Sequence, residues 1–156
     1  MRISNLCCLC FASVCLFLGG CSHKSAEYYK SADFKKVSKI DAHFHYNTKD
    51  IRYLEYAASL NFRLISPNVD AGVSIDDQLE IARTVKQRFP DKFTFLGTFS
   101  VDSFNNAGFA DRTIARIDKC MKMGASGIKI WKNIGMVLKD TSGRFVMERG
   151  RVGQTF

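Results

Sequence analysis

The segment Ile40-Asp41-Ala42-His43-Phe44-His45 ends an apolar run that begins at Val37. The run has strand character, and the two-residue period of a strand places the imidazoles of His43 and His45 on the same face. The residues expected on the opposite face, beneath covering helices, are Ile40, Ala42 and Phe44. The segment is therefore predicted to start a sheet that is buried on one side.

Two imidazoles on a rigid strand can supply two nitrogen ligands to one Zn²⁺ or similar divalent ion. Two of the three histidines in the chain lie here, directly after Asp41. This placement favours a metal site over the alternative, a pair of surface or core histidines that binds no metal.

Short apolar runs alternate with amphipathic segments beyond this point. The predicted strands are 37–45, 62–66, 93–99 and 127–131, and the predicted helices are 51–60, 74–89 and 111–123. Ser74 and Asp77 form a cap-like start for the second helix, Pro90 ends it, and Gly124 ends the third. This order predicts an α/β fold with a parallel sheet and right-handed crossovers.

With these residues in view, the chain resembles the amidohydrolase superfamily, particularly the amidohydrolase-related group, whose first barrel strand ends in His-x-His. The resemblance covers about residues 37–147. It implies the N-terminal half, about four βα units, of a TIM-type (β/α)₈ barrel with its site at the C-terminal mouth. It also implies a divalent metal, with Zn²⁺ expected, that His43 and His45 ligate, and a small-molecule substrate.

The fourth predicted strand supplies a further candidate ligand. In Gly127-Ile128-Lys129-Ile130-Trp131, Lys129 shares a face with Trp131, and the segment is similar to the one around the carbamylated, metal-bridging lysine of ureases. By that resemblance Lys129 is a metal ligand, and Lys132, nearer the strand end, is the alternative. Mononuclear members lack this bridge, so a lysine that binds a substrate carboxylate or reaches solvent stays open.

Several elements of the family's site have no counterpart in this sequence. The family places further histidines on the fifth and sixth strands and an aspartate on the eighth, whereas this chain has no histidine after His45. A complete barrel of this kind needs roughly 250 residues. We therefore expect a fragment that is inactive alone, whose catalytic residues stay unassigned and whose open strand edges could self-associate.

Two functions follow as alternatives. The family implies hydrolysis of a C–N or C–O bond of a small molecule, or decarboxylation. The rival is a non-enzymatic envelope lipoprotein or a truncated gene product. The loop residues Asn68, Asp70, Ser100 and Asp102 follow the second and third strands. They are interpreted as turn formers and are not assigned to catalysis.

The start of the chain has the pattern of an export signal. Leu6 to Leu18 is almost entirely apolar and precedes Gly19-Gly20-Cys21, which resembles the lipobox of bacterial lipoproteins. The run is shorter than the roughly 20 residues of a membrane span. We expect a signal peptide (1–20), a polar tether (21–36), the partial barrel (37–147) and an unstructured tail (148–156).

The expected location follows from this signal. Cys21 would carry a lipid that anchors the chain in the cell envelope, in the outer membrane if the cell has one. An ordinary signal peptide is the alternative. Only Cys120 lies beyond Cys21, so the mature chain cannot form an internal disulfide. The net charge of +8 comes from dispersed residues without a long basic run, so no nucleic-acid partner is expected.

The lipid anchor is tested by metabolic labelling with palmitate. Wild-type chain should incorporate the label, and Cys21→Ala should not, because the thiol that would carry the lipid is gone. Equal labelling of the two proteins would contradict the assignment.

Overall fold

The computed structural model describes residues 28–148, and the chain divides into two units, Met1–Ser31 and Ala32–Phe156. The predicted signal peptide and Cys21 therefore lie outside the described residues, as does nearly all of the predicted tail. Within 28–148 no helix is long and apolar enough to cross a membrane.

The second unit is an α/β structure with a parallel sheet. Strands β1 (Lys39–Asp41), β2 (Phe62–Pro67) and β3 (Phe93–Leu96) are hydrogen-bonded in the order β1-β2-β3. Lys39 pairs with Phe62, and Leu64 pairs with Phe93. The helices are α2 (Arg52–Ser59), α3 (Ile75–Arg88), α4 (Phe109–Lys122) and α5 (Asn133–Met136), and the 3₁₀ helices are η2 (Ser31–Asp33) and η3 (Val146–Glu148).

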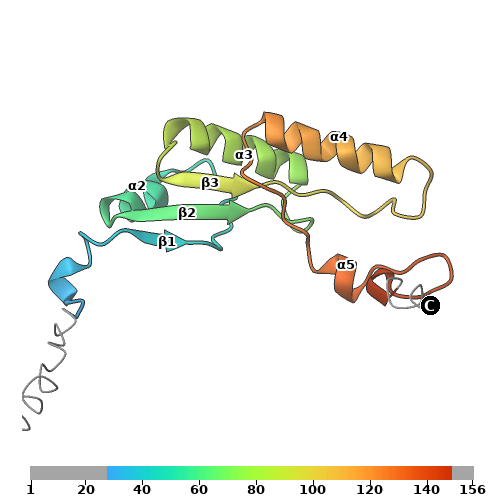
Figure 1. The fold of residues 1–156 in the computed structure, drawn as a ribbon. Coiled ribbons are helices and arrows are strands. Elements are labelled where there is room, and N and C mark those ends of the chain that lie inside the picture. Colours follow the sequence, from blue (N-terminus) through green and yellow to red (C-terminus); the bar gives the residue numbers. More distant parts are fainter. Residues whose placement is uncertain (1–27, 149–156) are drawn as a thin grey trace, which may run out of the picture. The chain divides into compact units, whose positions relative to one another are not determined.

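The long helices cover one face of the sheet. Figure 1 shows α3 and α4 along that face, and residues of α2, α3 and α4 share one buried cluster with the strands. Phe95 of β3 and Leu79 of α3 are fully buried at its centre. The alternation of buried and partly exposed residues along β3 is what a sheet covered on one side requires.

The predicted cap of α3 is confirmed. The Ser74 hydroxyl accepts a hydrogen bond from the Asp77 backbone N–H at 3.1 Å and donates one to the Asp77 carboxylate at 2.7 Å. Gln78, one residue further, is fully buried, and its amide bonds to the backbone N–H and C=O of Val69. The start of α3 thereby holds the loop that follows β2.

The predicted first strand is longer than the observed one, and part of its facing was wrong. β1 ends at Asp41, and a bend at Ala42 shifts the alternation by one residue. Ile40 is consequently 63% exposed on the uncovered face of the sheet, and Ala42 is exposed as well. Phe44 packs against the buried core as expected.

The fourth predicted strand, 127–131, is reduced to a single parallel bridge between Ile128 and Gly97. Gly97 donates to the carbonyl of Gly127 at 2.9 Å, and Lys129 donates to the carbonyl of Gly97 at 2.7 Å. Within the described residues nothing pairs with the other edge of this segment, and the chain enters α5 at Asn133. The described part of the chain thus contains a three-stranded sheet with a fourth segment attached, and it does not close into a barrel.

Gly97 tests the contact between this edge of the sheet and α4. A Cβ atom built at Gly97 would lie 2.5 Å from Cβ and 2.6 Å from Sγ of Cys120. Gly97→Ala should therefore lower the free energy of unfolding by about 1–3 kcal/mol, the usual cost of overpacking, in urea denaturation.

Gly135→Ala is the matched control, because the nearest atom to its added Cβ lies 3.7 Å away. It should leave the stability unchanged or slightly raised. A Gly97→Ala protein as stable as wild type would show that α4 does not pack on β3 as described.

Candidate metal centre

His43 and His45 lie just beyond β1, in a segment that continues alongside β2. Phe44 donates its N–H to the carbonyl of Ile65 at 3.2 Å, and Tyr46 donates its N–H to the Ser66 hydroxyl at 2.9 Å. Side chains therefore still alternate here as in a strand, although the sequence prediction of a continuous strand through His45 was wrong.

The aromatic residues of this segment anchor it to the core. Phe44 stacks on Tyr53 of α2 with ring centroids 4.6 Å apart, and Tyr46 meets Phe93 of β3 edge-on at 5.6 Å. Tyr46 is 1% exposed. Because these two rings point inward, the two imidazoles between and beside them point outward, and both histidines are exposed.

The two imidazoles converge on one point. His43 Nε2 and His45 Nε2 lie 3.1 Å apart, with the ring centroids at 5.0 Å. Two nitrogens bound to one tetrahedral Zn²⁺ at roughly 2.0–2.1 Å would be separated by about 3.3 Å. The observed separation thus fits chelation of one ion, and it equally suits an N–H···N hydrogen bond between two neutral rings.

Nearby polar contacts hold the backbone around the pair. The carboxylate of Asp41 accepts the N–H of His43 at 3.0 Å, and the Tyr46 hydroxyl donates to the carbonyl of Asp50. Burial, together with the charges of Asp50 and Glu55, raises the pKa of Tyr46. The phenol therefore stays protonated at neutral pH and keeps donating to the loop that follows the histidines.

Asp50, at the end of that loop, is held by Arg52. Hydrogen bonds from the Arg52 side chain and backbone lower the pKa of Asp50 to about 2. The Asp50 carboxylate is consequently ionised throughout the neutral range. It is paired with the guanidinium of Arg52 at the start of α2.

Lys129 lies at the opposite edge of the sheet from the histidines. Ile128 packs against the core beneath the helices, so the alternation of an extended segment turns Lys129 toward the uncovered face, to which His43 and His45 also point. Strands β2 and β3 separate this segment from β1. No described contact joins its ammonium to His43 or His45.

Lys132, the alternative lysine, is exposed and lies over the Trp131 ring at 5.1 Å. The structure thus brings the two histidines together and leaves both lysines apart from them. In residues 28–148 no group of three or more His, Cys, Asp or Glu side chains is arranged to hold a metal ion.

The loops at the carboxyl edge form a polar cavity of about 450 Å³ that Asp70, Ser74, Ser100, Asp102 and Asn133 line. Ser100 accepts the N–H of Asp102 at 3.3 Å, which is the turn-forming role expected of it.

Two amides near this edge have atoms that lack hydrogen-bond partners: Asn68, interpreted from the sequence as a turn former, and Asn133, not singled out from it. Asn68 is 1% exposed, and neither atom of its amide has a hydrogen-bond partner; the Oδ1 atom of Asn133 also lacks one. Burial of an amide cannot be inferred from an Asn in a loop sequence, because distant elements cause it.

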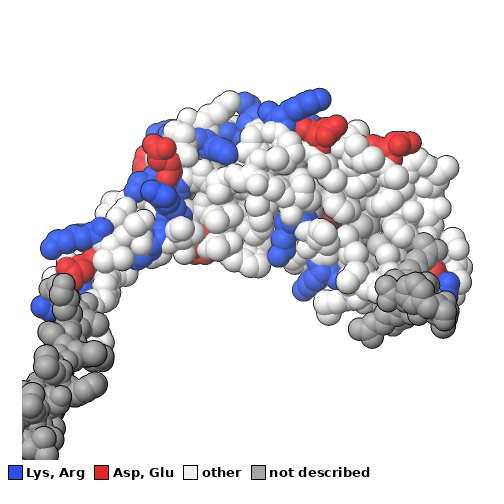
Figure 2. All heavy atoms as spheres, in the orientation of Figure 1, with Lys and Arg blue, Asp and Glu red and all other residues white. Residues whose placement is uncertain are grey.

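Charged side chains of both signs occur on the face of the molecule that Figure 2 draws. Figure 2 shows Lys and Arg interspersed with Asp and Glu on the face drawn, without a continuous basic stripe. On that face the distribution agrees with the dispersed charges of the sequence.

The chain was compared with known protein families, curated proteins and solved structures. No protein family, no curated protein and no solved structure matches the chain.

Proposed function

We propose that His43 and His45 are the first two ligands of a divalent-metal site of the amidohydrolase type, with Zn²⁺ as the metal. The observation that carries this proposal is the 3.1 Å separation of the two Nε2 atoms on exposed side chains. The parallel strand order supports the finer proposal that the unit corresponds to the N-terminal half of a (β/α)₈ barrel.

The position of the pair agrees with such a site. His43 and His45 follow the carboxyl end of a parallel strand, which is the edge at which α/β folds bind their ligands. A divalent ion held there would act as a Lewis acid on an amide, an ester or a carboxylate of a small molecule. The chain's own residues provide the orientation of the ligands.

Orientation depends on Phe44 and Tyr46, whose burial fixes the alternation of the segment. Removing either ring would free the backbone that spaces the two imidazoles, so these residues position the site without touching the metal. Both histidines are open to solvent, which leaves further coordination positions to water, substrate or additional protein ligands. Lys129 stays a proposed ligand only if the sheet curves enough to bring it near.

A second candidate function is a lipid-anchored envelope protein without enzymatic activity. The observation that favours it is that no three His, Cys, Asp or Glu side chains in the described part of the chain are grouped so that they could hold a metal ion. Two imidazoles alone hold a metal weakly.

Zinc affinity tests the proposed site. The full chain, in detergent and with its thiols alkylated so that cysteines cannot bind the metal, should bind one Zn²⁺ in calorimetry. His43→Ala and His45→Ala should each weaken that affinity about tenfold or more, within the range for loss of one protein–metal contact.

His23→Ala is the matched control, because it removes the third histidine of the chain, which is not among the proposed ligands. It should bind as tightly as wild type. Equal affinities in all four proteins would contradict the assignment of His43 and His45.

A hydrolysis assay tests whether the chain forms a complete catalytic site. With zinc bound, the full chain should cleave simple amides and esters no faster than free zinc does, because loss of general-base help typically costs about 10²- to 10⁴-fold in rate. Zinc-dependent turnover that His43→Ala abolishes would show instead that the chain completes its own site.

A further inference from the structure

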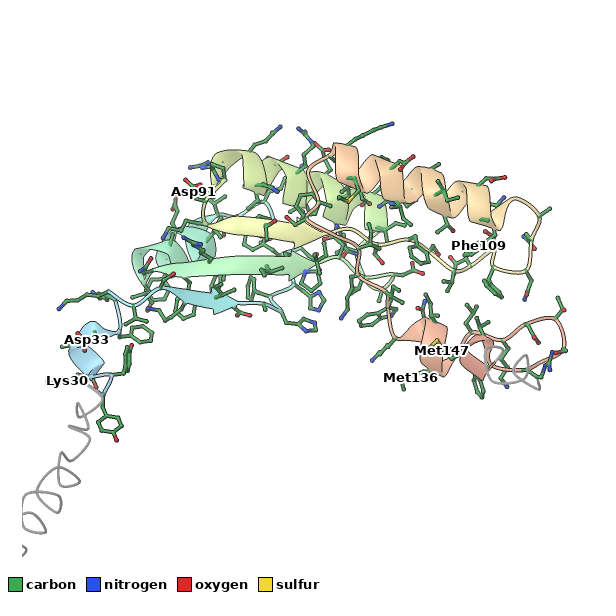
Figure 3. All side chains as sticks on the ribbon, in the orientation of Figure 1. Lys30, Asp33, Asp91, Phe109, Met136 and Met147 are labelled. Carbon is green, nitrogen blue, oxygen red and sulfur yellow. The ribbon has the colours of Figure 1, made fainter. Side chains whose placement is uncertain are left out.

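A second cavity lies apart from the histidine pair, between the start of α3, the loop after β3 and the first half of α4. Its volume is about 250 Å³. Phe109 lies at the N-terminal end of α4, beside that loop (Figure 3). Two arginines, Arg112 and Arg116, line the cavity together with hydroxyl side chains.

The guanidinium of Arg112 uses only some of its N–H groups in hydrogen bonds. It donates to the carbonyl of Ala107 at 2.9 Å and to the hydroxyl of Ser103 at 3.0 Å. Those bonds leave other N–H groups of the fork unused. None of the ion pairs among the described residues includes Arg112. An exposed guanidinium held in place by neutral oxygens is oriented for an anion that the protein itself does not supply.

Arg116 is more deeply placed, with its side chain 12% exposed. It donates to the carbonyls of Ile75 and Thr98 at 2.6 and 3.2 Å and to the carboxylate of Asp76 at 2.6 Å. Lys119 donates to the same carboxylate oxygen at 2.7 Å. One negative charge is thus shared by two positive ones.

Hydrogen bonds from Lys119 and Arg116 hold the pKa of Asp76 below its usual value, so it remains ionised at neutral pH. Among the residues that line the cavity, Arg112 and Arg116 carry positive charge and Asp76 alone carries negative charge, so the lining is net positive. The positive end of the α3 dipole, at Ile75 and Asp76, adds to this positive charge.

The remaining lining divides into polar and apolar parts. Ser100, Ser103 and Thr113 offer hydroxyl groups, which can donate to an oxyanion, and Phe99 and Phe109 offer ring surface. A bare ion would use only the polar part of this cavity.

We propose that this cavity binds the phosphate or carboxylate group of a small organic anion, with the Arg112 fork as its principal contact and the phenylalanine rings against its apolar body. The site is independent of the proposed metal centre. A planar guanidinium grips either oxyanion through paired N–H···O bonds, and this explains why a lysine would serve less well at position 112.

The test is calorimetric titration of the full chain, in detergent, with phenyl phosphate and with inorganic phosphate. A metal chelator is kept in the buffer so that phosphate cannot bind through a metal at the histidines. Wild type should bind both, phenyl phosphate more tightly. Arg112→Gln should weaken both about tenfold or more, as expected for loss of hydrogen bonds from a charged donor.

Arg88→Gln is the matched control, because it removes the same charge from an exposed arginine that does not line the cavity. It should bind like wild type, and circular dichroism should show all three proteins equally helical. No binding by wild type, or binding by Arg112→Gln equal to wild type, would overturn the proposal. Equal affinity for the two phosphates would overturn the role of the rings.

Discussion

Burial of one sheet face beneath α2, α3 and α4 is the constraint on which the rest of the molecule depends. The rings of Phe93, Phe95 and Tyr46 lie at that interface and exclude water from it. Each large side chain removed from water contributes roughly 1.5–3 kcal/mol, so the chain cannot change which residues face inward without a large loss. Every outward-facing side chain, including both histidines, takes its direction from this interface.

The candidate metal centre is a direct consequence. Because Phe44 and Tyr46 point into the core, the alternation of the segment places His43 and His45 together on its outer side. Their Nε2 atoms lie 3.1 Å apart there. Backbone hydrogen bonds to Ile65 and Ser66 tie the segment to β2. The two proposed ligands are therefore already close together, and this spacing would lower the entropic cost of binding a metal.

Much of the fold follows from local sequence signals, and its departures have physical causes. Ser74 and Pro90 mark the ends of α3 because a cap and a break act within one turn. The bend at Ala42 could not be predicted in this way, because the sequence has no Gly or Pro there. The small turn centred on Asp140, whose carboxylate accepts the N–H groups of Ser142 and Arg144, lacks any periodic pattern. The cavity that Arg112 and Arg116 line is formed by α3, α4 and the loop after β3, and no local sequence pattern predicts contacts between such distant segments.

The most direct test of the central claim is X-ray absorption spectroscopy of the thiol-alkylated chain loaded with one equivalent of Zn²⁺. Chelation by the converging imidazoles predicts two histidine nitrogens at about 2.0–2.1 Å from the metal, with oxygen ligands completing the shell. The histidine signal should vanish when His43 and His45 are both replaced by Ala. A shell of oxygens alone in the wild-type chain, or an unchanged spectrum in the double variant, would contradict the account.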